Sequence, residues 1–207
     1  MDKFNDSGFL FPYIRFFNAS PQGGSIDFYI GNTLVAAGIG FGHFTSFIKA
    51  GNGMQFYKAT RAGRKDEVIA DISLNQNIGQ VHSLCVIGKA DKPEFIAIEE
   101  PSKKRDTNYS NFRVCNISPY ETSFNVFAND NMILGDIKYK EVSDYMQMIP
   151  DNYEIAFSQN EKKVPAGMHT MKQGRFGTLY IIGLTDEQPF LRGEITVDAG
   201  SYSGFYL

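Results

Sequence analysis

The chain has 207 residues, and its 20 basic and 23 acidic side chains leave a formal net charge of −3. So small an imbalance excludes the basic footprint of a nucleic-acid-binding protein, and no run approaches the roughly 18 apolar residues of a membrane-spanning helix, so we expect no membrane insertion. The hydrophobic content of 43% and aromatic content of 14% exclude a disordered chain and predict packed domains.

In chain order, the first half reads as short strands separated by turns. The clearest strand, residues 25–30, alternates Ile26, Phe28 and Ile30 with Ser25, Asp27 and Tyr29, which predicts a half-buried antiparallel strand. Further strands are expected over residues 13–17, 33–36, 45–49, 54–59, 68–72, 84–87 and 95–98. The glycine-rich residues 38–42 lack the third glycine of a dinucleotide fingerprint. They predict a bend between strands, and we expect no cofactor.

The second half repeats the first. Residues 13–21 read Tyr-Ile-Arg-Phe-Phe-Asn-Ala-Ser-Pro, and residues 111–119, 98 positions later, read Asn-Phe-Arg-Val-Cys-Asn-Ile-Ser-Pro. Residues 123–128 match 25–30 at the same separation, and residues 178–183 match 83–88 at a separation of 95. A repeat at half the chain length predicts two copies of one domain.

We therefore predict an all-β chain of two tandem immunoglobulin-like antiparallel β-sandwich domains. The first is expected over residues 9–99 and the second over residues 110–207. Residues 100–109 carry many charges and almost no apolar side chains, so they are interpreted as a solvated linker.

The motif Ile-Arg-Phe-Phe-Asn-Ala-Ser-Pro, followed by Ser-Ile-Asp-Phe-Tyr-Ile, a glycine turn and an Ala-Gly-Asn hairpin, resembles the bacterial domain-of-unknown-function family numbered 4397. The second copy, with Phe-Arg-Val-Cys-Asn-Ile-Ser-Pro and Ser-Phe-Asn-Val-Phe, resembles it too, so the resemblance covers nearly the whole chain. It implies a tandem immunoglobulin-like sandwich, usually on surface or envelope proteins, with no established catalysis. Asn125 stands where the first copy has Asp27, so we expect any role of that carboxylate not to be shared.

The repeated arginines, Arg15 and Arg113, are the main polar candidates. As a binding site, each would contact a ligand or partner. As a structural residue, each would pair across strands, with Asp27 in the first copy, or donate to carbonyl groups of the neighbouring turn; the recurrence beside the same turn favours structure. The side chains expected to fix that turn are Asn18, Ser20 and Pro21 in the first copy and Asn116, Ser118 and Pro119 in the second.

Aromatic side chains outside the apolar stripes are candidate platforms for sugar rings. Four such positions are Tyr29, Phe127, Tyr139 and Tyr145, and we take Tyr139 and Tyr145 as binding candidates beside the two arginines. The chain has no Trp, so these rings are also interpreted as packing residues.

No constellation of catalytic or metal-ligating residues emerges. The three histidines lack ligand-spaced neighbours, and the cysteines, Cys85 and Cys115, are interpreted as buried free thiols in separate domains. The adjacent carboxylates Glu99 and Glu100 fall at the expected linker, where nothing would fix their separation. We expect no catalytic residues, no metal and no enzymatic activity.

These observations favour a non-catalytic structural or protein-interaction module of a bacterial surface layer, either the cell envelope or a spore coat. The alternative is a carbohydrate- or small-ligand-binding module. A protein partner, self-association and a glycan partner all stay open at this point. The N-terminal residues lack a secretion signal, so the expected location is left open between the cell envelope, a spore surface and the cytoplasm.

Overall fold

Strands dominate the structure. The computed structural model describes residues 10–102, 108–119, 123–159 and 162–202, and in these residues every regular element is a strand except a short 3-10 helix, Ala199–Ser201. The predicted all-β class is therefore confirmed. The chain divides into two units, residues 1–104 with 202–207 and residues 105–201.

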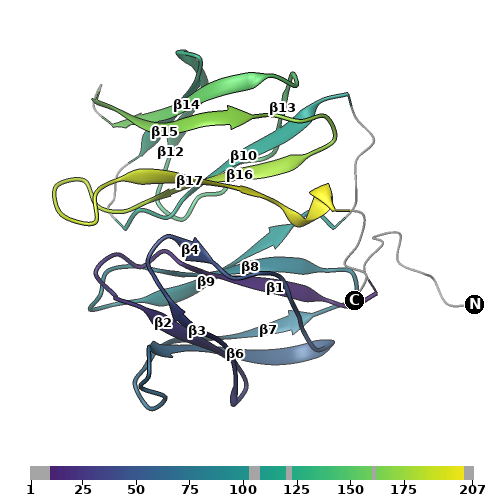
Figure 1. Cartoon of the computed structure of the whole chain (residues 1–207), viewed down its shortest axis with the longest axis vertical. Helices are drawn as coiled ribbons and strands as arrows, with labels where there is room; N and C mark the ends of the chain where they lie inside the picture. Colours follow the sequence, from purple (N-terminus) through teal and green to yellow (C-terminus); the bar gives the residue numbers. More distant parts are fainter. Residues whose placement is uncertain (1–9, 103–107, 120–122, 160–161, 203–207) are drawn as a thin grey trace, which may run out of the picture. The chain divides into compact units, whose positions relative to one another are not determined.

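The first unit consists of two sheets (Figure 1). One has the order β4-β1-β8-β9, with β5 also paired to β1, and the other has the order β3-β2-β6-β7. The bounds of the first sheet are β4 (His43–Phe44), β1 (Tyr13–Asn18), β8 (Val81–Ile87), β9 (Glu94–Glu100) and β5 (Ile48–Lys49). Those of the second are β3 (Thr33–Ile39), β2 (Ile26–Ile30), β6 (Gly53–Arg61) and β7 (Val68–Gln76).

The second unit repeats this plan, with sheet orders β13-β10-β16-β17 and β12-β11-β14-β15. Its first sheet contains β13 (Met146–Met148), β10 (Ser110–Asn116), β16 (Phe176–Ile182) and β17 (Arg192–Val197). Its second contains β12 (Asn131–Ile137), β11 (Phe124–Ala128), β14 (Asn152–Gln159) and β15 (Lys162–Thr170). The tandem β-sandwich architecture predicted from the repeat is thus confirmed.

One strand pair in each unit is parallel. β1 runs parallel to β8 over six residue pairs, as does β10 to β16, and the other ladders between described strands are antiparallel. The first strand of each unit thereby lies beside its next-to-last strand (Figure 1). The residues of β8 and β16 are all buried, which explains their nearly continuous apolar sequences.

The predicted linker begins inside a strand. β9 continues to Glu100, whose side chain is buried, and β10 begins at Ser110. Residues 103–107 of the predicted linker lie outside the described residues. The expectation that Glu100 lacks fixed surroundings is therefore wrong, and its partner is described below.

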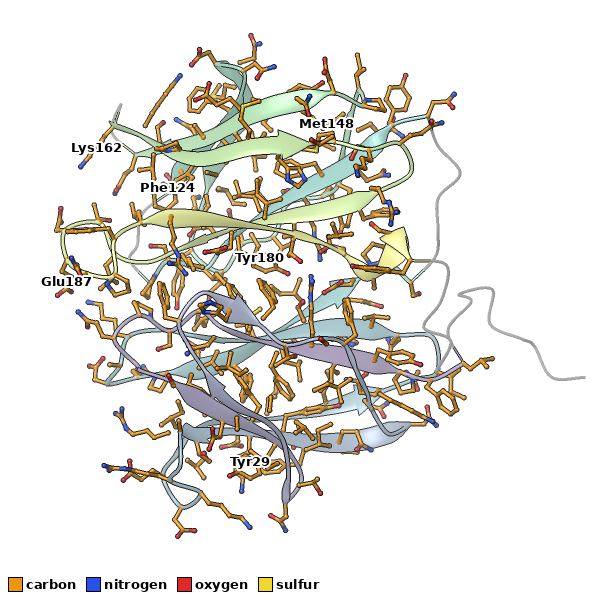
Figure 2. All side chains as sticks on the ribbon, in the orientation of Figure 1. Tyr29, Phe124, Met148, Lys162, Tyr180 and Glu187 are labelled. Carbon is orange, nitrogen blue, oxygen red and sulfur yellow. The ribbon has the colours of Figure 1, made fainter. Side chains whose placement is uncertain are left out.

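At equivalent positions of the two cores, a large side chain in one unit often corresponds to a small one in the other. Phe16 and Phe28 stack at a centroid separation of 4.5 Å in the first core, and Val114 and Val126 occupy these two positions in the second. Conversely, the positions of Ile14, Ile26 and Ala59 are taken by Phe112, Phe124 and Phe157. Figure 2 shows Phe124 inside the second unit, and its ring meets Phe157 edge-on at 5.4 Å. Such compensation keeps the core filled without changing the backbone plan.

A double bulge shapes the same edge of both units. The pairings β2–β3 and β11–β12 each shift register twice, at equivalent residues. Asp27 Oδ1 accepts a hydrogen bond from the Gly38 amide at 2.7 Å, and Asn125 Oδ1 accepts one from the Asp136 amide at 3.0 Å. Gly38 and Asp136 both have positive φ, 67° and 54°. The expectation that Asn125 shares no role with Asp27 is therefore wrong, because an amide oxygen accepts this bond as a carboxylate oxygen does.

The second carboxylate oxygen of Asp27 makes a further hydrogen bond. Asp27 Oδ2 accepts from the Gly63 amide at 2.8 Å, so Asp27 ties the bulge to the loop between β6 and β7. Asp27 is buried whereas Asn125 is exposed.

We predict that Asp27→Ala lowers the free energy of unfolding of the first unit by roughly 1.5–3 kcal/mol, and that Asn125→Ala lowers that of the second by about 0.5–1.5 kcal/mol. Urea unfolding followed by hydrogen exchange measures both losses, and an equal loss would contradict this assignment.

Candidate functional site

Arg15 forms a buried polar cluster on the face of its sheet opposite the core. It lies in β1 directly across from Ser83 of β8, and its Nε donates to Ser83 Oγ at 2.8 Å. Its terminal nitrogen lies 2.8 Å from Glu100 Oε1, and Ser83 Oγ donates to the same carboxylate at 2.5 Å. Arg15 is 4% exposed, Ser83 0% and Glu100 2%, so the cluster is withdrawn from water.

Two aromatic rings complete this cluster. The guanidinium carbon of Arg15 lies 4.8 Å from the ring centroid of Phe44 and 4.9 Å from that of Phe47. Phe44 stacks on Phe17 at 3.7 Å with an interplanar angle of 3°. A planar cation shielded by ring faces gains more from cation–π attraction than an exposed pair does. The cluster thereby connects β1, β8 and β9 to the segment that carries β4.

The second unit contains an equivalent cluster. Arg113 Nε donates to Thr178 Oγ1 at 2.9 Å, and Thr178 Oγ1 donates to Asp198 Oδ2 at 2.5 Å. The guanidinium carbon lies 4.6 Å from the Tyr145 ring centroid, and the Tyr145 hydroxyl donates to Asp198 Oδ2 at 2.7 Å. Arginine, hydroxyl, carboxylate and aromatic ring therefore recur in both copies, with the identity of the last three changed.

The Asn-x-Ser-Pro turns beside the arginines are fixed by the side chains predicted from the sequence. Asn18 Oδ1 accepts from the Ser20 amide at 3.3 Å, and its Nδ2 donates to the carbonyls of Gly24 and Ile39 at 2.9 Å. Ser20 Oγ donates to the Gly88 carbonyl at 2.9 Å. The turn is thereby attached to three neighbouring segments.

The second turn repeats this set with the same atoms. Asn116 Oδ1 accepts from the Ser118 amide at 3.1 Å, Asn116 Nδ2 donates to the Ile137 carbonyl at 3.0 Å, and Ser118 Oγ donates to the Gly183 carbonyl at 2.9 Å. The backbone bond that follows the arginine recurs too, since the Phe16 and Val114 amides donate to the hydroxyls of Thr45 and Ser143 at 2.9 and 3.0 Å. These contacts explain the recurrence of Asn and Ser as local structure. Pro21 and Pro119 are the last residues of the two Asn-x-Ser-Pro motifs, and Pro21 lies in a turn; proline contributes no backbone N–H at these positions.

Burial keeps two groups near Arg113, Tyr145 and Cys115, uncharged. Burial, and secondarily the Asp198 carboxylate, raise the pKa of Tyr145 far above its usual range, so its hydroxyl stays a donor. Burial raises the pKa of the Cys115 thiol to about 12, so it stays protonated and a poor nucleophile. Cys85 and Cys115 are both free and buried, which confirms the interpretation of the cysteines.

The structure separates the four predicted binding candidates. Arg15 and Arg113 lie in separate equivalent clusters, and Tyr145 belongs to the second of them. Tyr139 instead follows β12, with its ring 5.4 Å from the Lys140 ammonium. The expected partnership of Arg15 with Asp27 is wrong, because Glu100 and Ser83 provide the arginine's contacts while Asp27 binds backbone amides.

The partners of the arginines were missed in the sequence, although a signal for them existed. Ser83 and Thr178 begin the matching stretches separated by 95 residues, and Glu100 and Asp198 are separated by 98. A carboxylate recurring in both copies at the same distance from the arginine indicates that each cluster includes a carboxylate. Assigning residues 100–109 to a linker concealed it.

Within the described residues, no group of three or more His, Cys, Asp or Glu side chains is arranged to hold a metal ion. None of the described helices is long and apolar enough to cross a membrane. Ser83 and Thr178, the hydroxyls nearest the arginines, are fully buried and bonded to a carboxylate rather than to a histidine. Each cluster joins side chains from several segments of its own unit.

Comparison with known proteins identifies a matching protein family. The family described as "Domain of unknown function (DUF4397)" matches residues 12–123 and again residues 110–198. No curated protein matches the chain. Among solved structures, the C-terminal domain of AlgF from P. aeruginosa is similar over 44% of this chain and 98% of its own length, with 18% sequence identity and a TM-score of 0.36.

The buried ion pair gives a first prediction for the site. Arg15→Met leaves the Glu100 carboxylate buried without its cation, so we predict a loss of about 3–5 kcal/mol in the free energy of unfolding of the first unit. Adding Glu100→Gln should restore part of that loss. The matched control is Arg61→Met, which removes a half-exposed pair with Glu67 and should change stability little. Urea unfolding that shows similar losses for both single variants would contradict a structural role for Arg15.

Two histidines give a second prediction. Burial lowers the pKa of His82 and of His169, and the nearby Glu99 only partly opposes this at His82. A histidine whose pKa is depressed by folding stabilises the protein above its unfolded pKa, about 6.5, and that contribution is lost as the pH falls below it. We predict that the melting temperature decreases between about pH 7 and pH 5, and decreases less in the double variant His82→Gln, His169→Gln. An equally steep decrease in the variant would locate the acid sensitivity elsewhere.

Proposed function

We propose that this chain, which belongs to the DUF4397 family, is a non-catalytic structural or protein-interaction module of a bacterial surface layer. The observation that supports this proposal is that the repeated polar residues bind groups within their own unit. The arginines, their carboxylate partners and the Asn and Ser side chains of the turns all bind groups of their own unit. The repeated polar residues thus support a scaffold role, because their hydrogen bonds connect segments within each unit.

Exposed apolar side chains offer the contact surface that such a module needs. Leu34 and Met132 occupy equivalent positions, across from Tyr29 and Phe127, and are 48% and 62% exposed. Met54 and Phe56 project from β6 on the face opposite the core and are 69% and 44% exposed. Exposed apolar side chains of this kind, present in each unit, are typical of protein–protein contacts.

The aromatic rings on these sheets support a sugar-binding role less well. The Lys58 ammonium lies 4.7 Å from the Tyr29 ring centroid, and that of Lys163 lies 4.6 Å from the Phe127 centroid. Tyr29 is only 5% exposed. A ring already covered by a lysine offers little face to a sugar, so the carbohydrate alternative rests on other parts of the chain.

The proposal is tested by protease treatment of intact cells that produce the chain from its own gene. A surface-layer protein is degraded by added protease while a cytoplasmic marker survives. Leu34→Lys together with Met132→Lys should release the protein from the layer without lowering its melting temperature, whereas Ile149→Lys, at a loop residue of similar exposure, should leave it in place. Full protection of the native protein in intact cells would overturn the surface location.

A further inference from the structure

A cavity of about 200 Å³ opens at one end of the second unit. One side is formed by Gln159, the last residue of β14, and Lys162, the first residue of β15, and the other by the loop 183–191, which joins β16 to β17. Figure 2 labels Lys162 on β15 and Glu187 on the loop. The described lining residues are Gln159, Lys162, Val164, Thr185, Phe190 and Leu191.

The loop wall of this cavity is held in place at its base. The Leu184 amide donates to the Pro189 carbonyl at 2.8 Å, and the Leu191 amide donates to the Leu184 carbonyl at 2.9 Å. Leu184 itself is 1% exposed. The loop therefore closes on itself over a buried anchor, and the Phe190 ring is left 58% exposed. A preformed wall of this kind is a common feature of small-ligand sites.

The tandem repeat provides an internal comparison. The equivalent loop of the first unit, residues 88–93, has six residues, whereas residues 183–191 number nine. In both loops the chain returns close to the glycine at its start. A Cβ on Gly88 would collide with the Lys92 carbonyl, and one on Gly183 would collide with the Phe190 carbonyl. Phe190 thus takes the place of Lys92. The first unit shows that the fold is complete without the three additional residues, so these residues shape the cavity rather than the sandwich.

The lining combines an apolar floor with donors at the rim. Val164 and Leu191 pack against the core of the unit, and Phe190 adds an aromatic wall. Thr185 Oγ1 donates to Gln159 Oε1 at 3.4 Å, which leaves the Gln159 amide nitrogen able to donate. Among the described residues, no hydrogen bond or ion pair engages the Lys162 ammonium. None of the described lining residues is acidic.

We propose that this cavity is a binding site for a small organic carboxylate with an apolar or ring-shaped body. Lys162 and the Gln159 amide nitrogen bind the carboxylate, while Phe190, Val164 and Leu191 enclose the body. The volume is below the range of roughly 300–1,000 Å³ typical of drug-sized ligands, so the ligand is small. This inference goes beyond the proposed scaffold function and does not depend on it.

Benzoate and its uncharged analogue benzamide test the site, with chemical shifts of the ¹⁵N-labelled full chain as the readout. Benzoate is expected to shift the amide resonances of Gln159, Thr185 and Leu191, with binding weakened roughly tenfold or more by Lys162→Gln because a charge-assisted bond is lost. Phe190→Ala should weaken the binding of benzoate as well. Lys172→Gln is the matched control, since Lys172 is an exposed lysine of the same unit outside the described lining.

The proposal is overturned if benzoate shifts none of these resonances, if benzamide binds as well as benzoate, or if Lys162→Gln and Lys172→Gln bind benzoate equally. The unchanged spectrum of each variant outside the cavity verifies that it is folded. Failure here would leave the surface-layer proposal intact, because protease treatment of cells does not depend on this cavity.

Discussion

The constraint on which both units depend is the burial of an arginine beside a parallel strand pair. A guanidinium removed from water is costly unless every neighbouring group compensates it. Arg15 meets a carboxylate, a hydroxyl and two aromatic rings drawn from three other segments of its unit. Because these segments are distant in sequence, the arginine can be accommodated only when β1, β8 and β9 stand in their native order. The buried ion pair therefore requires the native arrangement of these strands.

Comparison of the two copies separates what this constraint fixes from what is free to change. The arginine and the Asn-x-Ser-Pro turn keep their identities, whereas serine becomes threonine, glutamate becomes aspartate and phenylalanine becomes tyrosine in the second cluster. The shorter Asp198 is met by the Tyr145 hydroxyl, a donor that Phe47 lacks. In the cores, large and small side chains exchange places while the strands keep their order. Volume and hydrogen bonding can thus be redistributed within a unit, but the planar cation is retained.

Much of the fold could be predicted from the repeat, since alternation and turn residues mark the strands in both halves. The parallel pairing of β1 with β8 could not, because alternation reports which face of a strand is buried and says nothing of its neighbour. Glu100 was assigned to a linker because the charges that follow it conceal the end of β9. The cavity has no comparable signal, because Lys162 begins β15 whereas Phe190 lies in the loop before β17, and only the three-residue difference between the loops before β9 and β17 marks the place.

The central claim is that Arg15 and Arg113 are internal structural residues of a folded scaffold. The most direct measurement is the hydrogen exchange of their Nε–H groups, observed by NMR on the intact chain. Bonds of 2.8 and 2.9 Å to buried hydroxyls predict that both protons exchange far more slowly than that of the half-exposed Arg61, and that a tenfold change in protein concentration or the addition of a partner leaves them unchanged. Exchange as fast as that of Arg61 would contradict this claim and would indicate that both arginines are exposed contact residues.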